Sequence, residues 1–260
     1  VAYMAARAAE EALSDARMRP EEIDLLLVST MSSERIMPCA ACEVQKLIGA
    51  VNAACFDLNG ACTGFLLALN TAQAYLGQQI YRRALVIGSE TLSHLTNWKD
   101  RSTCVLFGDG AGAAVFELAE NVPFAVTLGA RGSEAIRAGG PAACDTAPIT
   151  MDGKAVFRFA VETMPRCLQT VLDRSQKTLA DLAWVVCHQA NSRIIDHCIK
   201  HLHAEPSKFY KNMDRHGNTS AASIPIALHE MEESGLLRPG QTLACIGFGG
   251  GLTWGGMLLT

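Results

Sequence analysis

The stretch "DLNGACTGFLLAL", Asp57 to Leu69, places one cysteine between two glycines, where a predicted strand gives way to a predicted helix. The apolar run before it is strand-like, and residues 62 to about 78 have helical character. A cysteine used only for packing needs no glycines beside it. A nucleophile does, because backbone must come close to the group that it attacks. The segment predicts an α/β fold with Cys62 as its candidate nucleophile.

Strands and helices alternate along the whole chain, which is typical of an α/β protein. The predicted strands include "IDLLLVST", "RRALVIGSE", "LAWVVCHQ" and "QTLACIGF", as well as 103–107 and 209–213. Residues 137–151 are rich in glycine, proline and alanine and are interpreted as a connection. After this connection the same order of elements begins again, so the sequence predicts two halves, residues 1–136 and 137–260.

Matching positions support this duplication. Two pairs lie 157 positions apart, Asp24 with Asp181 and Gly60 with Gly217, and a third pair, Gly88 with Gly247, lies 159 apart. An internal repeat of this length predicts similar α/β halves that pack as layers. On this alignment Cys62 falls beside "NTS", 218–220, and the strand end that carries His188 is the equivalent of Met31.

The bulk composition excludes several classes of protein. The chain has 260 residues and a net charge of −4, with 49% hydrophobic and 18% charged residues. A mildly acidic chain does not suggest a nucleic-acid binder. No apolar run approaches the roughly 20 residues of a membrane span, and there is no signal-peptide pattern. The numbers indicate a protein with a sizeable core.

The ten cysteines are scattered rather than paired. Cys55, Cys187 and Cys245 fall in apolar strand-like runs, where cysteine usually acts as a small core residue of a reduced, cytosolic protein. The single CxxC at Cys39 and Cys42 has no second pair and no supporting histidines. Ordinary helix packing is therefore favoured over a zinc or redox site there, and no metal is expected.

Four signals carry chemistry. Cys62 at a helix N-terminus is expected to have a lowered pKa, and its amide can help to hold an oxyanion. His188 follows "WVVC", at the carboxyl end of a predicted strand, and Asn218 offers an uncharged donor. "FGGGLTWGG" from Phe248 lets a peptide N–H come close to a substrate carbonyl. The first three also have plainer interpretations, as a core cysteine, a strand-end histidine and a helix cap.

"GDGAGAA", 109–114 with its flanking residue, is similar to a phosphate-binding loop. It lacks the lysine of such loops and runs into a predicted strand. We interpret it as close backbone packing between strands.

Six segments together resemble one family, and they follow that family's order along nearly the whole chain. They are "NGACTGF", "DRSTCVLFGDGAGAAV", "MDGKAVFRFAV", "HQANSRII", "DRHGNTSAASIPIAL" and "FGGGLTWG". The chain resembles the thiolase-fold condensing enzymes and, among them, the β-ketoacyl-ACP synthase III family, where ACP is acyl carrier protein. The resemblance implies a layered αβαβα fold. Thiolases carry a second cysteine, and elongating synthases a second histidine, where this chain has Asn218.

The resemblance implies an initiating reaction of type II fatty acid synthesis. Cys62 would take the acyl group of an acyl-CoA primer as a thioester. His188 and Asn218 would bind the malonyl thioester carbonyl of malonyl-ACP and promote loss of CO₂, and the enolate would attack the acyl group. The amides of Cys62 and Gly250 would hold the oxyanion, and Phe248 would give the carboxylate an apolar setting.

The resemblance also implies roles for residues around the site. They are CoA contacts for Arg101, Asn191 and Gly153, an acyl pocket lined by Phe107 and by Met37 of a second subunit, and ACP contacts for Arg158, Arg193 and Lys200. It implies a cytoplasmic homodimer that meets through "AACFDL", has no cofactor and binds neither nucleic acid nor membrane. The family carries roughly fifty further N-terminal residues, so we expect the natural chain to begin before Val1.

Two other interpretations stay open. The chain is alternatively a Cys-His-Asn starter synthase of a polyketide or quinolone pathway, with the same chemistry on another donor or acceptor. A non-catalytic partner subunit, such as a chain-length factor, is the second alternative, but such subunits typically lose the cysteine. The intact Cys62, His188 and Asn218 argue against it. The sequence does not give the length of the primer.

Overall fold

Two large β-sheets, a small two-stranded sheet and three layers of helices are found in the computed structural model, which describes residues 1–119, 124–139 and 147–260. The helices are α1 (Ala2–Asp15), α2 (Ala40–Ile48), α3 (Gly64–Gly77), α4 (Gly153–Ser175), α5 (Ser192–His201), α6 (Met213–His216) and α7 (Ser223–Glu233). The strands are β1 (Leu25–Ser29), β2 (Ala54–Leu58), β3 (Arg83–Glu90), β4 (Gly110–Glu117), β5 (Val126–Ala130), β6 (Ile136–Arg137), β7 (Thr150–Met151), β8 (Trp184–Cys187), β9 (Phe209–Tyr210), β10 (Leu243–Gly249) and β11 (Thr253–Leu259).

The two large sheets have matching topologies. The first has the order β2-β1-β3-β4 and the second β5-β11-β10-β8-β9. In each sheet three strands are parallel, namely β2, β1 and β3 or β9, β8 and β10, and the next strand, β4 or β11, is antiparallel. The carboxyl ends of β1 and β8 therefore occupy equivalent places.

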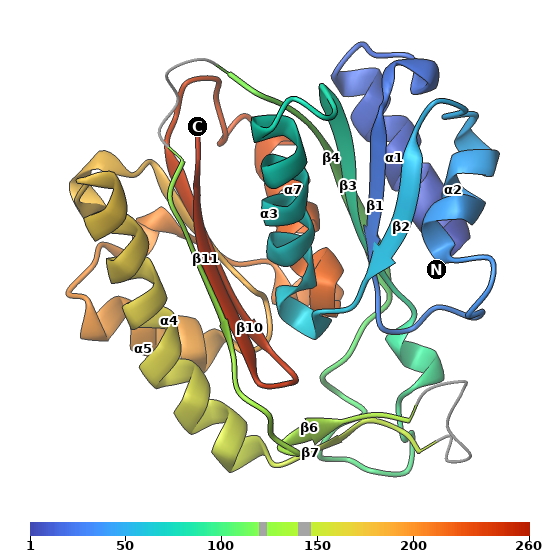
Figure 1. Ribbon diagram of the computed structural model, residues 1–260. Coiled ribbons are helices and arrows are strands. Elements are labelled where there is room, and N and C mark those ends of the chain that lie inside the picture. Colours follow the sequence, from blue (N-terminus) through green and yellow to red (C-terminus); the bar gives the residue numbers. More distant parts are fainter. Residues whose placement is uncertain (120–123, 140–146) are drawn as a thin grey trace.

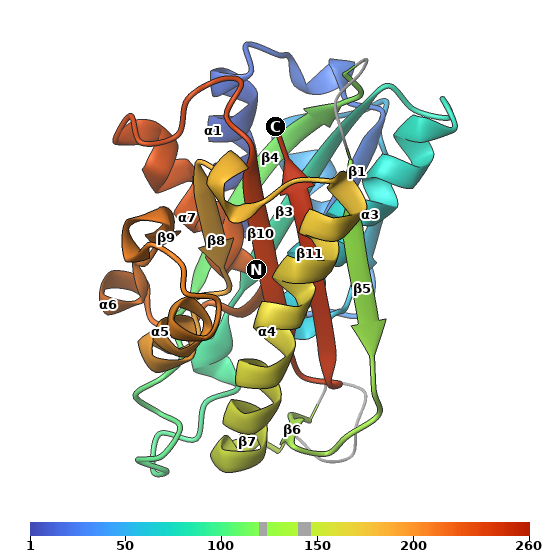
Figure 2. The ribbon, with the colours of Figure 1, turned by 90° about the vertical axis from the view of Figure 1, so that its left-hand side faces the viewer.

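Helices α3 and α7 form the central layer, between the two sheets (Figure 1). Phe65 of α3 and Met231 of α7 are fully buried in one cluster with side chains of both sheets, such as Val86 and Val186. A helix covered on both sides has to be apolar around most of its surface, which explains the run "GFLLAL". Helices α1 and α2 cover the outer face of the first sheet, and α4 and α5 that of the second (Figures 1 and 2). The predicted αβαβα layering is confirmed.

The strand pairing corrects the register of the repeat. Ser29 pairs with Gly88 between β1 and β3, and Cys187 pairs with Ile246 between β8 and β10, so His188 stands next to Gly247. The equivalent of His188 is therefore Ser29, 159 positions earlier, and the predicted equivalence with Met31 is wrong by two residues.

The two residue pairs that lie 157 positions apart fall in loops. A shift of two residues in the alignment is not visible there, because no strand pairing fixes the register. The counterpart of Asp181 is Glu22 rather than Asp24. Each of these carboxylates is the third residue of a short 3₁₀ turn, Pro20–Glu22 or Leu179–Asp181, and accepts the backbone N–H that precedes the turn.

Sheet membership differs from the predicted division of the chain at residue 136. β5 pairs with β11 from Thr253↔Ala130 to Met257↔Val126, so it is the edge strand of the second sheet. The chain thus passes from the first sheet to the second between β4 and β5. Residues 137 and 150 pair in the small β6-β7 hairpin, and residues 140–146 of the predicted connection lie outside the described residues.

One predicted strand is wrong and another is too long. Residues 103–106 form turns, because the Asp100 carboxylate accepts the N–H and hydroxyl of Ser102 and the hydroxyl of Thr103, and Phe107 makes only an isolated β-bridge with Asn218. In 209–213 only Phe209 and Tyr210 pair in a strand. At Asn212 the backbone N–H donates to the Gln189 side chain and the side-chain NH₂ donates to Glu230, and the chain then turns into α6.

The glycines of "GDGAGAA" lie where β4 passes close to α7. A Cβ on Gly112 would stand 2.7 Å from the backbone nitrogen of Ile226. Close backbone packing at this motif is confirmed, but Gly112 packs against the helix α7 rather than against another strand as predicted.

Candidate active site

A cavity of about 300 Å³ opens where the N-terminal ends of α3 and α7 meet. Eight of the predicted site residues line it, namely Cys62, Phe107, Gly153, His188, Asn191, Asn218, Phe248 and Gly250. The rest of the lining is mostly apolar and includes Met31, Leu106, Ile136, Ile149, Met151, Val156, Phe157 and Ile194. The three residues of the predicted triad come from both halves of the fold and meet at this one cavity.

The turn that carries Cys62 is tightly bent against β10. Cys62 is the middle residue of a 3₁₀ turn, Ala61–Thr63, that leads into α3, and Ala61 has a φ of 46°. A Cβ on Gly249 would lie 2.8 Å from both the nitrogen and the Cβ of Cys62. The glycine run therefore lets the backbone reach the thiol, and the Gly250 amide lies close enough to hydrogen-bond with the Cys62 sulfur.

The protonation of Cys62 differs from the prediction. Burial raises the pKa of the thiol to about 11, although hydrogen bonding to Ser220 and to the amides of Cys62 and Gly250 opposes this. The expected lowering of the pKa at a helix N-terminus is therefore wrong for the unliganded site, since loss of water outweighs the local N–H groups. The resting residue is a neutral thiol that needs a proton acceptor.

His188 is buried and held by one side-chain contact. Its Nδ1 lies 2.7 Å from Oγ of Ser223, the first residue of α7. That hydroxyl oxygen also accepts the Gln189 N–H at 3.4 Å, so its own proton is free to point at Nδ1. This arrangement favours the tautomer that carries the imidazole proton on Nε2. Burial lowers the pKa of His188 to about 3, so the ring is neutral, and it packs edge-on against Phe248 at 5.3 Å between centroids.

Asn218 is fixed by its backbone and by its side-chain oxygen. Its N–H donates to the Leu106 carbonyl at 2.8 Å, and its carbonyl accepts the Gly108 N–H at 3.0 Å. Oδ1 accepts the Ser220 N–H at 2.9 Å. The side-chain NH₂ is therefore left as the group that can donate into the cavity. Gly108 makes the approach feasible, because a Cβ there would meet the His216 carbonyl oxygen at 2.1 Å.

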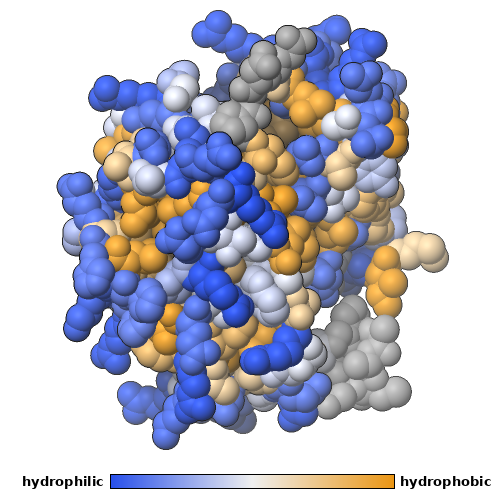
Figure 3. All heavy atoms as spheres, turned by 60° about the vertical axis from the view of Figure 1, so that its left-hand side comes forward, coloured by the Kyte–Doolittle hydropathy of each residue, from blue (hydrophilic) through white to orange (hydrophobic). Residues whose placement is uncertain are grey.

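Five predicted site residues do not line the cavity. Arg101, Arg158, Arg193 and Lys200 are exposed, and Met37 is 85% exposed on the loop between β1 and α2. Arg101 is nevertheless adjacent to Ser102, which does line it. Figure 3 shows the face toward α4 and α5, where hydrophilic side chains are interspersed with hydrophobic ones.

Sequence reasoning missed three polar residues of the site, Ser220, Ser223 and Glu90. Ser220 and Ser223 stand in the quoted motif "GNTSAASIPIAL", but they are also common helix-capping residues there. In the correct register Ser223 is the counterpart of Gly64, and His188 is the counterpart of Ser29. The hydrogen-bonded pair His188 and Ser223 in the second half therefore stands where the first half has the small residues Ser29 and Gly64. This difference between the two halves is the sequence feature that could have identified Ser223.

No helix among the described residues is long and apolar enough to cross a membrane. In the same part of the chain no group of three or more His, Cys, Asp or Glu side chains is placed to hold a metal ion. Cys39 and Cys42 are free thiols whose sulfur atoms lie 3.5 Å apart at the start of α2.

Comparisons with known proteins agree with this geometry. Residues 56–132 match the family model for 3-oxoacyl-[acyl-carrier-protein (ACP)] synthase III, and residues 172–260 match the model for the C-terminal part of that family. The β-ketoacyl-[acyl-carrier-protein] synthase III of Clostridium acetobutylicum is 45% identical over 268 residues, which cover 98% of this chain and 82% of the relative.

Solved structures give the same result. The 3-oxoacyl-[acyl-carrier-protein] synthase III of Aquifex aeolicus superposes with a TM-score of 0.94 at 39% identity, over 99% of this chain and 83% of that one. The priming β-ketosynthase of the R1128 polyketide pathway also reaches 0.94, at 34% identity, over 99% of this chain and 80% of its own. The chain therefore belongs to the β-ketoacyl-[acyl-carrier-protein] synthase III family of thiolase-fold condensing acyltransferases.

Proposed function

We propose that this chain carries out the initiating condensation of type II fatty acid synthesis, in which a CoA-bound primer is joined to malonyl-ACP. The observation that carries the proposal is the convergence of Cys62, His188 and Asn218 on one apolar cavity. A thiol alone would serve many reactions, whereas a thiol facing two uncharged donors suits acyl transfer followed by enolate formation.

Cys62 supplies the nucleophile of the first half-reaction. Its sulfur attacks the thioester carbonyl of the acyl-CoA, the acyl–sulfur bond forms, and CoA leaves as its thiol. The amides of Cys62 and Gly250 both lie within hydrogen-bonding reach of the sulfur, and in this scheme these two N–H groups hold the oxyanion of the tetrahedral intermediate.

His188 and Asn218 serve the second half-reaction. The Nε2–H of His188 and the NH₂ of Asn218 donate to the malonyl thioester oxygen, where negative charge develops as CO₂ departs. Phe248 is 3% exposed and gives the malonyl carboxylate an apolar surrounding, which favours its loss as neutral CO₂. The resulting enolate carbon attacks the acyl group on Cys62 and releases 3-oxoacyl-ACP, and no cofactor enters this scheme.

The substrates reach the cavity past α4 and α5. Gly153 and Asn191, at the starts of these helices, line the cavity and are proposed to flank the pantetheine arm, with Arg101 on the CoA side. Phe107 is proposed to bound the acyl group. Three exposed basic residues on the same two helices are proposed to meet the acidic carrier protein, namely Arg158, Arg193 and Lys200.

A homodimer is proposed on the strength of the β2 edge. β2 is the edge strand of the first sheet and is half-buried along its length, with its neighbours Met37 and Val51 exposed by 85% and 72%. An exposed edge strand beside apolar side chains is normally covered by a partner. In such a dimer Met37 would reach the acyl cavity of the other subunit. Sedimentation of the protein at micromolar concentration should show a dimer, and a monomer would contradict this part of the proposal.

A starter synthase of a polyketide pathway is the second candidate. The R1128 priming β-ketosynthase shares the fold at the same TM-score as the Aquifex aeolicus enzyme, so the fold does not separate the two functions. We propose the cytoplasm as the site of action in either case, supported by the nine described cysteines, which are all free.

Intact-mass measurement after incubation with a panel of acyl-CoAs tests the function directly. The proposal expects one acyl group per chain, on Cys62 by peptide mapping, followed by conversion to 3-oxoacyl-ACP when malonyl-ACP is added. Acylation mainly on Cys104 or Cys187 would contradict it. Acylation of Cys62 with no turnover of malonyl-ACP would favour the starter synthase with another acceptor.

A further inference from the structure

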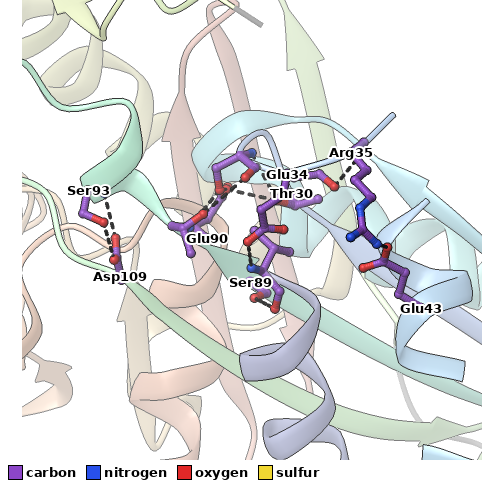
Figure 4. A network of polar contacts seen from close by, with 12 residues as sticks. Thr30, Glu34, Arg35, Glu43, Ser89, Glu90, Ser93 and Asp109 are labelled. Atoms are coloured by element: carbon purple, nitrogen blue, oxygen red, sulfur yellow. Dashed lines mark hydrogen bonds and ion pairs between the residues drawn. The ribbon is translucent and has the colours of Figure 1, made fainter. Parts of the chain in front are cut away.

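A buried carboxyl lies behind the site and has no place in the scheme above. Glu90 ends β3 with no exposed surface. Its Oε2 accepts the Thr30 hydroxyl at 3.2 Å, the Met31 N–H at 3.1 Å and the Ser32 hydroxyl, and Figure 4 shows it beside Thr30. Its Oε1 has no hydrogen-bond partner among the described residues. An unpaired oxygen on a buried carboxyl calls for an explanation, because burial without a partner destabilises the fold.

Ser220 stands between this carboxyl and the nucleophile. Its side chain is 1% exposed, and its hydroxyl makes no well-formed hydrogen bond within the described residues. The hydroxyl is nevertheless close enough to both neighbours to lower the pKa of the Cys62 thiol and that of the Glu90 carboxyl. Ser220 lines the cavity together with Cys62, and its turn packs against both the Cys62 turn and β3, the strand that Glu90 ends, so Ser220 Oγ and Glu90 Oε1 are two buried groups with unused capacity near the reactive sulfur.

The repeat explains why they meet. In the corrected register Glu90 is the counterpart of Gly249, and the turn Ser220–Ala222 is the counterpart of the turn that carries Cys62. Gly249 packs directly on the Cys62 turn. In the other half Gly88, the counterpart of Gly247, packs on the Ser220–Ala222 turn, since a Cβ there would lie 2.4 Å from the Ala221 carbonyl oxygen. One half of the fold thus places a glycine where the other half places a carboxyl.

We propose that Glu90 is a positioning residue that accepts the Cys62 proton through the Ser220 hydroxyl during acyl transfer. The proton leaves Sγ for Oγ of Ser220 while the hydroxyl proton of Ser220 passes to Oε1 of Glu90. The Sγ–acyl bond forms, the acyl–CoA bond breaks, and the proton returns by the same route to the CoA sulfur. No proton is gained or lost overall, and the proposal rests on the acyl-transfer function proposed above.

Glu90 is better suited to this role than His188. Burial lowers the pKa of His188 to about 3, so the imidazole is a weak proton acceptor. Burial raises the pKa of Glu90 to about 7, near the range in which a base works best. Titratable groups on the elements around Glu90 include the Cys62 thiol, Glu34, which pairs with the N-terminal amine, His94, and Asp109, which accepts from Ser93.

The test measures Cys62 acylation by acetyl-CoA in single turnovers from pH 5.5 to 9.5, with alkylation by iodoacetamide as a substrate-free measurement. In the unmodified protein both rates should rise through a step near pH 7. Glu90→Gln should abolish the step and slow acylation at pH 8 by about a hundredfold, the low end for a general base. Ser220→Ala should also abolish the step and slow acylation, although Glu90 keeps its hydrogen bonds to residues 30–32. Ser32→Ala, which removes a hydrogen bond that lowers the pKa of Glu90, should move the step to higher pH.

The proposal would be overturned if both Glu90→Gln and Ser220→Ala still showed the rise in rate near pH 7. It would also be overturned if Ser32→Ala left the pH of this rise unchanged. Equal loss of acylation and of CO₂ release from malonyl-ACP in Glu90→Gln would indicate a structural role and also overturn it. If no acyl-CoA modifies Cys62, the proposed function fails. The alkylation profile then still decides whether Glu90 holds the thiol proton.

Discussion

The backbone N–H of Ser220 donates to Oδ1 of Asn218 at 2.9 Å and thereby settles which end of the Asn218 amide faces the cavity. Ser220 in turn adopts a φ of 50°, a conformation that side chains other than glycine rarely take. The bent turn aims its N–H at the neighbouring side chain two residues earlier. Donor capacity in the site therefore comes from a specific backbone conformation as well as from the identity of Asn218.

Replacement of Asn218 should separate the two half-reactions. Asn218→Asp keeps an oxygen for the Ser220 N–H but replaces the donor with an acceptor, and Asn218→Ala removes both. Both variants should still form acyl-Cys62, yet lose condensation by on the order of a hundredfold or more, the usual effect of removing one such donor. Labelled CO₂ release, measured beside the mass of the acyl-enzyme, checks this. Lost acylation with normal CO₂ release would assign Asn218 to the cysteine instead.

Cys62→Ala should show the reverse pattern. Without a thiol no acyl-enzyme forms, whereas His188 and Asn218 remain in place to polarise the malonyl thioester. The variant should therefore release CO₂ from malonyl-ACP and form no 3-oxoacyl-ACP. The same two assays apply, and absence of CO₂ release in a variant with an unchanged thermal midpoint would contradict the division of roles.

Ser223→Ala should weaken the second half-reaction through His188. Loss of the hydroxyl leaves Nδ1 without a donor, so the imidazole proton is no longer held on Nε2. We expect CO₂ release to fall by about tenfold, equivalent to a neutral hydrogen bond of roughly 1.4 kcal/mol, with acylation of Cys62 unchanged. Ser223→Thr retains a hydroxyl and is the matched control. A similar loss in both variants would indicate a packing defect.

Charge reversal on α5 should act on the carrier protein alone. Arg193→Glu or Lys200→Glu should weaken the reaction with malonyl-ACP far more than acyl transfer from CoA, and the difference should grow at low salt because attraction between exposed charges is then less screened. Arg238→Glu, at the exposed turn before β10, is the matched control. KM for malonyl-ACP across a salt series is the measurement, and equal losses in both half-reactions would argue against a docking role.

Acid stability should depend on Glu230 of α7. Its partial burial acts to raise its pKa, but hydrogen bonds from Arg215, His216 and Asn212 lower the pKa of Glu230 to about 2, against an ordinary value of 4.5. A carboxyl with a lowered pKa contributes stability that is complete above pH 4.5 and is lost as the pH falls toward 2. Glu230→Gln should lower the free energy of unfolding at pH 7 and flatten its decline between pH 4.5 and 2, as measured by urea unfolding. An identical pH profile in the variant would contradict this.

The sequence predicted the layered fold from local signals, and it predicted from the internal repeat and the family resemblance that Cys62, His188 and Asn218 lie together. Alternating apolar strands and helices, and a cysteine among glycines, need no knowledge of distant contacts. The register of the repeat was less accessible, since short loops such as the one at Asp24 tolerate shifts that a strand does not. The pKa of Cys62 and the role of Glu90 were beyond reach, because burial depends on which residues from the other half close over them.

The bent turns at Ala61 and Ser220 have a consequence for how this enzyme can be stabilised. Each holds a residue other than glycine at positive φ, an arrangement that costs on the order of 1 kcal/mol. Glycine at either position would relieve the strain and raise the melting temperature, so a screen for heat resistance would readily select Ala61→Gly. The same change would make the backbone at the Cys62 amide more flexible in the free enzyme. Heat resistance and turnover thus place opposite demands on these two positions. Substitutions that stabilise the enzyme without lowering its rate have to lie elsewhere in the fold.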